Sequence, residues 1–201
     1  MRAVVIGNGD IKNYEYIKSR IKDSDFIICA DGGIRHIKPL GVSADVAIGD
    51  FDSAKKPDDI KTYRYPTDKD FTDGELALDY AEKNGYGEIL MIGMTGTRLD
   101  HTITNILLMT KYDKICLVDD HNEIYVVKDR LTISDRKGKT LSVIPIFQNL
   151  EGVTTSGLLY PLNSESLCFA SGRGNSNVIT EDECTISVKS GMGIVLINNG
   201  E

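Results

Sequence analysis

Carboxylates gather at four places in the chain, each directly after a short apolar run. The sharpest cluster is Asp50-Phe51-Asp52, in which two acids at positions i and i+2 follow the apolar run 46–48. In an extended chain such side chains project to the same side, so both can hold one cation. Gathered carboxylates need a cation, and hard oxygen donors favour Mg²⁺, whose shell is commonly completed by phosphate. The pattern predicts an enzyme that acts on a nucleotide or another polyphosphate.

The other acidic clusters carry groups that could bind phosphate. They are Asp31-Gly32-Gly33, the segment 67–73 with Asp68, Asp70 and Asp73, and Arg98-Leu99-Asp100-His101. Arg98 can hold a phosphate through both arms of its guanidinium group. Lys69 could contact a phosphate, although a lone lysine in an acidic loop is more often a solvated counter-charge. His36 and His121 have no nearby candidate ligands and are interpreted as ordinary surface or core residues.

Several of these residues also have a purely local explanation. Asp52 could close an Asx-turn, and Asp73 in a first helical turn would stabilise the helix dipole by about 0.3–1 kcal/mol. Gly32-Gly33 could simply turn the chain, and Asp100 could cap a helix. The pair Gly7-x-Gly9 lacks the third glycine of a dinucleotide fingerprint, so it carries little weight.

The elements that must position these clusters alternate in type up to about residue 120. Short apolar runs predict strands at 3–6, 26–30, 46–48, 62–65, 89–92 and 115–118, and i, i+3/i+4 spacing predicts helices at 11–21, 72–84 and 102–111. Such alternation predicts a doubly wound, mostly parallel α/β sheet with helices on both faces. Ligands of these sheets bind beyond the carboxyl ends of the strands. We therefore expect the clusters to meet at one edge.

The composition changes beyond Asp129, where Asp becomes rare and Ser, Thr and Gly increase. Short β-type runs follow at 140–147, 167–170, 184–188 and 194–197, which predicts an all-β sandwich or barrel. We place an α/β domain at 1–125 and a β-rich domain at 126–201. Residues 121–128 fit either the last strand of the first domain or a connector.

Whole-chain properties narrow the functional class. A length of 201 residues allows one large domain or two small ones with cores of their own. The net charge of −7, without a basic cluster, argues against nucleic acid or an anionic membrane as a partner. Cys29, Cys116, Cys168 and Cys184 lie in apolar stretches without Cys-x-x-Cys spacing, which predicts reduced core thiols and a cytoplasmic protein. No run approaches the ~20 apolar residues of a membrane span.

Taken in order, the clusters resemble the thiamine pyrophosphokinase family. The matching segments extend over nearly the whole chain and are 5–9, 30–33, 49–53, 68–75, 95–101, 156–160 and 174–177. The resemblance implies transfer of pyrophosphate from ATP to the hydroxyl of thiamine, giving AMP and thiamine diphosphate, with Mg²⁺ as cofactor. It also implies a catalytic α/β domain, a thiamine-binding β domain, and a homodimer whose active site is shared between subunits.

The same resemblance implies roles for individual residues. The Mg²⁺ ligands would be Asp50, Asp52 and Asp73, and Asp70 or Asp100 would accept the hydroxyl proton. The ATP and phosphate site would contain Asp31, Gly32, Lys69, Asp70, Arg98, Asp100 and His101, and the thiamine site Tyr160, Ser176 and Asn177. Two departures are Ile34-Arg35, where the family often has Ala-Asn, and Tyr160, where a tryptophan is common. Tyr160 could instead be packed in the β core.

Two other functions fit parts of the pattern. A haloacid-dehalogenase-like phosphatase also has an Asp-x-Asp pair after a strand, but usually after the first strand, whereas here the pair follows the third expected strand. A nucleotide-sensing module without turnover would keep the fold. Binding alone does not need so many carboxylates, which argues against it.

Overall fold

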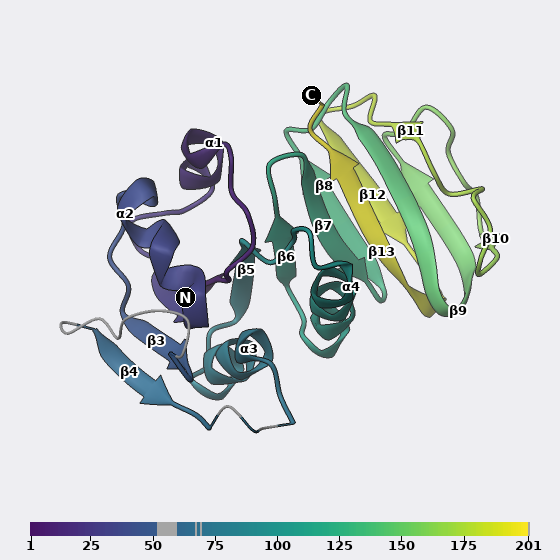
Figure 1. The fold of residues 1–201 in the computed structure, drawn as a ribbon. Helices are drawn as coiled ribbons and strands as arrows, with labels where there is room; N and C mark the ends of the chain where they lie inside the picture. The colour runs from purple at the N-terminus through teal and green to yellow at the C-terminus, as the bar shows by residue number, and fades with distance from the viewer. Residues whose placement is uncertain (52–59, 67, 69, 201) are drawn as a thin grey trace. The chain divides into compact units, whose positions relative to one another are not determined.

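The computed structural model describes residues 1–51, 60–66, 68 and 70–200 (Figure 1). The chain divides into two compact units, which we call unit 1 (residues 1–120) and unit 2 (residues 121–201). The predicted boundary after residue 125 falls inside β7 (Asn122–Val127), a strand of unit 2. Among the described residues, no helix has both the length and the apolar character needed to cross a membrane.

Unit 1 is built on six parallel strands in the order β4-β3-β2-β1-β5-β6. The strands are β1 (Arg2–Ile6), β2 (Phe26–Ala30), β3 (Val46–Gly49), β4 (Lys61–Arg64), β5 (Glu88–Ile92) and β6 (Ile115–Val118). Each predicted strand is confirmed to within one residue at either end. The inner strands are apolar runs buried along almost their whole length, as expected for parallel strands covered on both faces.

The helical elements described in unit 1 are α1 (Tyr14–Ser19), the 3-10 helix η1 (Asp31–His36), α2 (Ile37–Leu40), α3 (Asp73–Lys83), α4 (Leu99–Leu108) and the 3-10 helix η2 (Met109–Lys111). Figure 1 shows α1 next to α2 and α3 next to α4, and each pair is in contact. Helix α3 begins after Thr72, whose hydroxyl accepts a hydrogen bond from the N–H of Glu75, the first half of a capping box. Helix α1 is shorter than predicted because Asn13 caps it at Tyr14.

All elements described in unit 2 are strands, and their pairing is antiparallel (Figure 1). They are β7, β8 (Arg130–Ser134), β9 (Thr140–Ser156), β10 (Glu165–Leu167), β11 (Asn177–Val178), β12 (Glu183–Ser187) and β13 (Ser190–Asn198). The order is β7-β13-β9-β12-β8, with β10 and β11 also paired to β9. The mixed α/β class predicted from the sequence is therefore confirmed.

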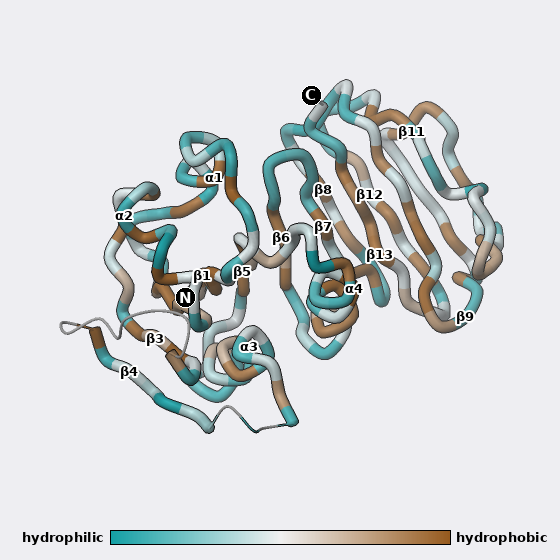
Figure 2. The backbone as a smooth tube through the Cα atoms, viewed as in Figure 1, coloured by the Kyte–Doolittle hydropathy of each residue, from teal (hydrophilic) through white to brown (hydrophobic). Residues whose placement is uncertain are grey.

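Strand β9 organises unit 2 because it pairs with four other strands. Its first part pairs with β13, and its last residues pair with β12 after an irregularity that includes Phe147 at φ 67°. Polar and apolar residues alternate along it, as Figure 2 shows, and Leu141, Val143 and Val153 are buried in the core of the unit. The predicted end at residue 147 was wrong because the strand continues beyond this bulge.

Two further predictions for unit 2 need correction. The predicted strand 167–170 is wrong, because β10 ends at Leu167 and Ala170 adopts φ 58°, a left-handed conformation that a strand does not contain. The neighbouring Cys168 is exposed, so the prediction that all four cysteines are core thiols fails there, although Cys29 and Cys184 are buried. All four cysteines are free.

Candidate functional site

A cavity of about 390 Å³ opens in unit 1 at the carboxyl ends of β1 and β5. The strand order reverses between these two neighbours, and the loops that leave such a point diverge and form a crevice. The loops after β1 and β5, the start of η1, the start of α3 and the first half of α4 line the cavity. Of the predicted site residues, it brings together Asp31, Asp73, Arg98 and His101.

The loops after β1 and β5 approach each other so closely that only glycine fits. A Cβ atom on Gly9 would lie 2.0 Å from the carbonyl oxygen of Thr95, and one on Gly7 would lie 2.6 Å from that of Gly93. The N–H of Gly9 donates to Gly93 O at 2.6 Å. Gly7-x-Gly9 is an incomplete dinucleotide fingerprint, but in the fold the pair allows two loop backbones to form one wall of the cavity.

The Asp31-Gly32-Gly33 cluster is held against the end of β1. A Cβ atom on Gly33 would lie 2.0 Å from Ile6 O, so this glycine allows η1 to rest on the strand. Asp31 has φ 42° and lines the cavity, and its Oδ1 atom is buried. A Cβ atom on Gly49 would lie 3.0 Å from Asp31 Cα, so Asp50 follows β3 next to this position. The glycines therefore serve close approach as well as chain reversal.

The predicted metal ligands are only partly described. Asp50 is 8% exposed, and Asp73 is the first residue of α3 with its Oδ1 atom buried. Asp52 and Lys69 lie outside the described residues. Within the described part of the chain, no three His, Cys, Asp or Glu side chains are arranged to hold a metal. The carboxylate oxygens of Asp50 and Asp73 have the donor chemistry that Mg²⁺ prefers, and the ligand set remains a prediction.

Arg98 directs its guanidinium fork at Asp100. Its Nε donates to Oδ1 at 2.9 Å and its Nη2 donates to Oδ2 at 2.6 Å, and both side chains are mostly exposed. These hydrogen bonds hold the pKa of the Asp100 carboxyl well below its usual range. Asp100 lies inside the first turn of α4 and Arg98 is the cap residue, so the alternative reading of Asp100 as a helix cap was wrong. Asp70 is exposed.

Sequence reasoning missed several polar residues that shape the cavity. Asn105 on α4 is 9% exposed, and its Nδ2 donates to Met94 O at 2.8 Å, which fixes the loop after β5. Thr95 Oγ1 donates to Asp119 Oδ2 at 3.2 Å. These residues belong to no acidic cluster. The position of Thr95 just after a strand was the one available signal.

Unit 2 has a pocket of its own, of about 260 Å³, lined by both apolar and polar side chains. The predicted thiamine residues Tyr160 and Asn177 line it, and so does the ion pair of Glu165 and Arg173. Tyr160 is 66% exposed, so the alternative that it packs in the core was wrong. Ser176 does not belong to the pocket lining; its N–H donates to Ser142 Oγ at 3.0 Å.

Asn177 has a specific structural partner in this pocket. Its Oδ1 accepts the N–H of Tyr160 at 3.0 Å, and its Nδ2 donates to Tyr160 O at 2.8 Å. The amide thus pairs with both backbone groups of one residue, in the manner of a neighbouring strand. The tyrosine backbone is fixed while its ring stays accessible.

Comparison with known proteins agrees with this division of the chain. The family model described as "Thiamin pyrophosphokinase, catalytic domain" matches residues 17–118, and the one described as "Thiamin pyrophosphokinase, vitamin B1 binding domain" matches residues 123–193. The thiamine pyrophosphokinase of Bacillus subtilis is 30% identical over 182 residues, which are 84% of this chain and 85% of that protein.

Solved structures show the same likeness in three dimensions. The crystal structure of thiamine pyrophosphokinase from Bacillus subtilis matches with a TM-score of 0.89 at 26% identity, covering 100% of both chains. That of thiamin pyrophosphokinase from Geobacillus thermodenitrificans matches with a TM-score of 0.87 at 25% identity, covering 100% of this chain and 99% of that one. Sequence, family models and fold thus agree over both units, and the chain belongs to the thiamin pyrophosphokinase family.

Proposed function

We propose that the chain performs the pyrophosphoryl transfer of its family with the polyphosphate of ATP in the unit 1 cavity. Membership of the family makes it an enzyme that forms thiamine diphosphate from thiamine. The observation that carries the placement of ATP is the cavity itself, which lies at the reversal of strand order and combines loop backbone with Arg98 and His101.

We further propose that unit 1 is doubly wound with helices on both faces, and that unit 2 is a sandwich or barrel.

Arg98 is proposed to bind phosphate by exchanging its partner. Ion pairs between exposed side chains are weak in water, so the pair with Asp100 is easily given up for a phosphate of higher charge. Until then Asp100 holds the guanidinium fork in one orientation. We assign Asp100 this orienting role and propose Asp70 as the group that takes the hydroxyl proton of thiamine.

Asp50, Asp52 and Asp73 are proposed to hold Mg²⁺ beside the phosphates. When bound, the ion would neutralise charge on the transferred group. Asp31 and the backbone at Gly32 would contact the nucleotide at the same edge, and Lys69 would add positive charge. Most of the rate enhancement would then come from positioning and charge neutralisation by these side chains.

Thiamine is proposed to bind at the unit 2 pocket. Its thiazolium ring is cationic, and the accessible face of Tyr160 would attract it by roughly 0.5–2 kcal/mol. Asn177 would act through the backbone of Tyr160, and Ser176 would supply a polar contact nearby. The apolar part of the lining suits the flat rings of thiamine.

One assay tests the reaction directly. The protein is incubated with ATP, MgCl₂ and thiamine, and the phosphorus species are followed by ³¹P NMR. We expect AMP and thiamine diphosphate in equal amounts, and no turnover without thiamine. Formation of ADP would contradict pyrophosphoryl transfer, and inorganic phosphate with an acyl-phosphate on Asp50 would favour the phosphatase alternative.

We also propose a homodimer in which the active site combines residues of both subunits. An Asp50→Asn protein is mixed with a Tyr160→Ala protein at a thiamine concentration well below the raised KM of the Tyr160→Ala protein. The mixture should then be more active than the mean of the two separate proteins, because one of the two sites in a mixed dimer carries neither change. Subunit exchange is verified with differently tagged chains. No recovery despite proven exchange would place all these residues in a site within one chain.

A further inference from the structure

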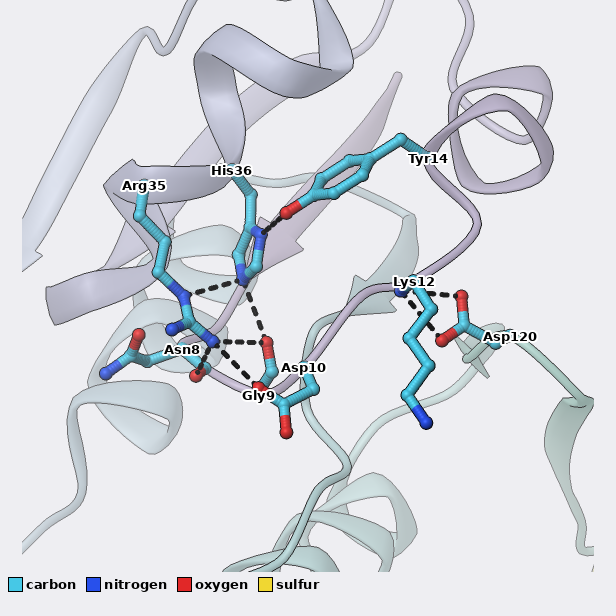
Figure 3. Close-up of polar contacts among 8 residues, drawn as sticks. All are labelled: Asn8, Gly9, Asp10, Lys12, Tyr14, Arg35, His36 and Asp120. Atoms are coloured by element: carbon cyan, nitrogen blue, oxygen red, sulfur yellow. Dashed lines mark hydrogen bonds and ion pairs between the residues drawn. The ribbon is translucent and has the colours of Figure 1, made fainter.

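Two neighbouring residues of η1, Arg35 and His36, hold the loop between β1 and α1 (Figure 3). Arg35 Nη2 donates to Asn8 O at 2.9 Å and to Gly9 O at 3.1 Å, and it lies 3.3 Å from Asp10 Oδ1. His36 Nε2 lies 2.8 Å from the same Gly9 carbonyl. Two carbonyl groups and one carboxylate of this loop therefore converge on the two side chains.

His36 is fixed by its surroundings. It is 2% exposed, and its Nδ1 lies 2.7 Å from the hydroxyl of Tyr14 (Figure 3). His36 Nε2 also lies 3.2 Å from Arg35 Nε (Figure 3). In one tautomer Nε2 donates to the Gly9 carbonyl and Nδ1 accepts from the Tyr14 hydroxyl; in the other, Nε2 accepts from Arg35 Nε. We call Tyr14, Arg35 and His36 the loop brace. Both ring nitrogens of His36 therefore have polar partners, so His36 is more than an ordinary buried residue.

The brace acts on a wall of the cavity. Asn8, Gly9 and Asp10 all line it, although Arg35 and His36 do not. In a trans peptide the N–H points opposite to the preceding C=O. Holding the Gly9 carbonyl towards the brace therefore turns the Asp10 N–H to the other side, where a Cβ atom on Gly96, another lining residue, would lie 3.7 Å from Asp10 N.

The rest of the loop is fixed as well. Asp120 accepts the N–H of Lys12 at 2.9 Å (Figure 3). It also accepts the N–H of Asn13 at 2.9 Å. Gly9 N is bound to Gly93 O. The part held by Arg35 is therefore the segment of this loop that both lines the cavity and depends on a charged side chain for its conformation.

We infer that Arg35 is a positioning residue for the nucleotide: its guanidinium group sets the backbone of residues 8–10 so that this wall receives the phosphates of ATP. This inference rests on the proposed placement of ATP in the unit 1 cavity. The planar guanidinium group places Nη2 on the loop and, at the same time, Nε 3.2 Å from His36 Nε2, so two nitrogens in a fixed geometry are used. The single nitrogen of an ammonium group cannot reproduce this arrangement.

The test compares Arg35→Ala and Arg35→Lys with a matched control, Arg2→Ala. Arg2 makes the same kinds of bond in the same unit, to Arg20 O at 2.8 Å and to both oxygens of Asp25, but at the opposite end of β1. For each variant we would measure kcat, the KM values for ATP and thiamine, the melting temperature, and calorimetric binding of the unreactive analogue α,β-methylene-ATP.

Arg35→Ala should raise the KM for ATP and the Kd for the analogue about 10-fold or more, the scale of a lost charged hydrogen bond. The KM for thiamine and kcat should stay near parent values. Arg35→Lys should recover only part of this loss, and Arg2→Ala should lower the melting temperature without changing the KM for ATP.

The possible outcomes separate the inference from the proposed function. A KM for ATP at the parent value in Arg35→Lys would show that charge alone matters and would overturn the inference. An unchanged ATP KM in Arg35→Ala, with parent turnover intact, would also overturn it while leaving the proposed function standing. A parent that binds the analogue but forms no AMP would overturn the function, and a parent that does not bind the analogue would overturn both.

Discussion

The cavity of unit 1 and the pocket of unit 2 have different linings. Loop backbone and charged side chains from the loops line the cavity, whereas the pocket combines leucine and valine side chains, an accessible tyrosine and the ion pair of Glu165 and Arg173. The difference follows from strand direction. Parallel strands end together and send their loops to one edge, which suits a polyphosphate, while antiparallel strands present side chains on a face, which suits flat organic rings. The predictions below would break or sharpen this comparison.

The largest effect is expected from the carboxylates of unit 1. Asp50→Asn and Asp73→Asn should each lower kcat by about 100-fold or more, the scale seen when one charge-stabilising group is removed. Steady-state rates at saturating Mg²⁺ measure this effect, and circular dichroism verifies the fold. Asp23→Asn, in an exposed loop of the same unit, serves as the control. Near-parent rates in both variants would remove the metal role.

A smaller loss is expected at Arg98. Arg98→Lys should lower kcat/KM for ATP about 10-fold, because an ammonium group cannot replace the two-armed contact. Asp100→Asn should cost less than Arg98→Lys, since Asp100 only orients the guanidinium group. Both are read from initial rates with varied ATP. If Asp100→Asn is the more damaging, Asp100 acts directly in the reaction.

Changes in the unit 2 pocket should affect the KM for thiamine and not the KM for ATP. Tyr160→Ala should raise the KM for thiamine about 2- to 30-fold, from a lost cation–π contact of roughly 0.5–2 kcal/mol, and leave the KM for ATP nearly unchanged. Tyr160→Phe keeps the ring and should stay close to the parent. A joint loss for ATP and thiamine would end the functional distinction between the two regions.

The smallest effect concerns pH. Burial lowers the pKa of His36 below its ordinary value of about 6.5, and the nearby Arg35 acts in the same direction, against the Gly9 carbonyl and Asp10. The unfolded chain then binds more protons than the folded one, so stability is complete above about pH 6.5 and falls as the pH drops through the folded pKa. Urea unfolding between pH 7.5 and 5 measures this slope. His36→Phe should flatten it, and an unchanged slope would contradict the assignment.

The sequence predicted the parts of the molecule that depend on local patterns. The central strands of unit 1 were found because apolar runs such as Phe26–Ala30 are buried along almost their whole length. The acidic motifs pointed to Asp31 and Asp73, which the cavity brings together. Helices η1 and α2 were missed because they are too short to show a helical period.

What could not be predicted depends on contacts between distant residues. Arg35 looked like a departure from a motif, and only the fold shows that it reaches the carbonyl groups of Asn8 and Gly9. Asn105 sits on a helix without any motif, and it fixes a loop that precedes it in the chain. The end of strand β9 was predicted too early. A bulge interrupts the alternation on which the prediction relied, and the strand continues beyond it.

The shared pairing of β9 has a consequence for how unit 2 opens. Because β9 pairs with β13 in its first part and with β12 in its last, neither partner can separate from it without disturbing a strand that the other also needs. The amide hydrogens of β12 and β13 should therefore exchange with solvent at similar, slow rates, as one cooperative unit. In unit 1, β4 pairs with one strand among the described residues, and its own residues are exposed or half-buried. Its amides should exchange first, by fraying from the edge of the sheet.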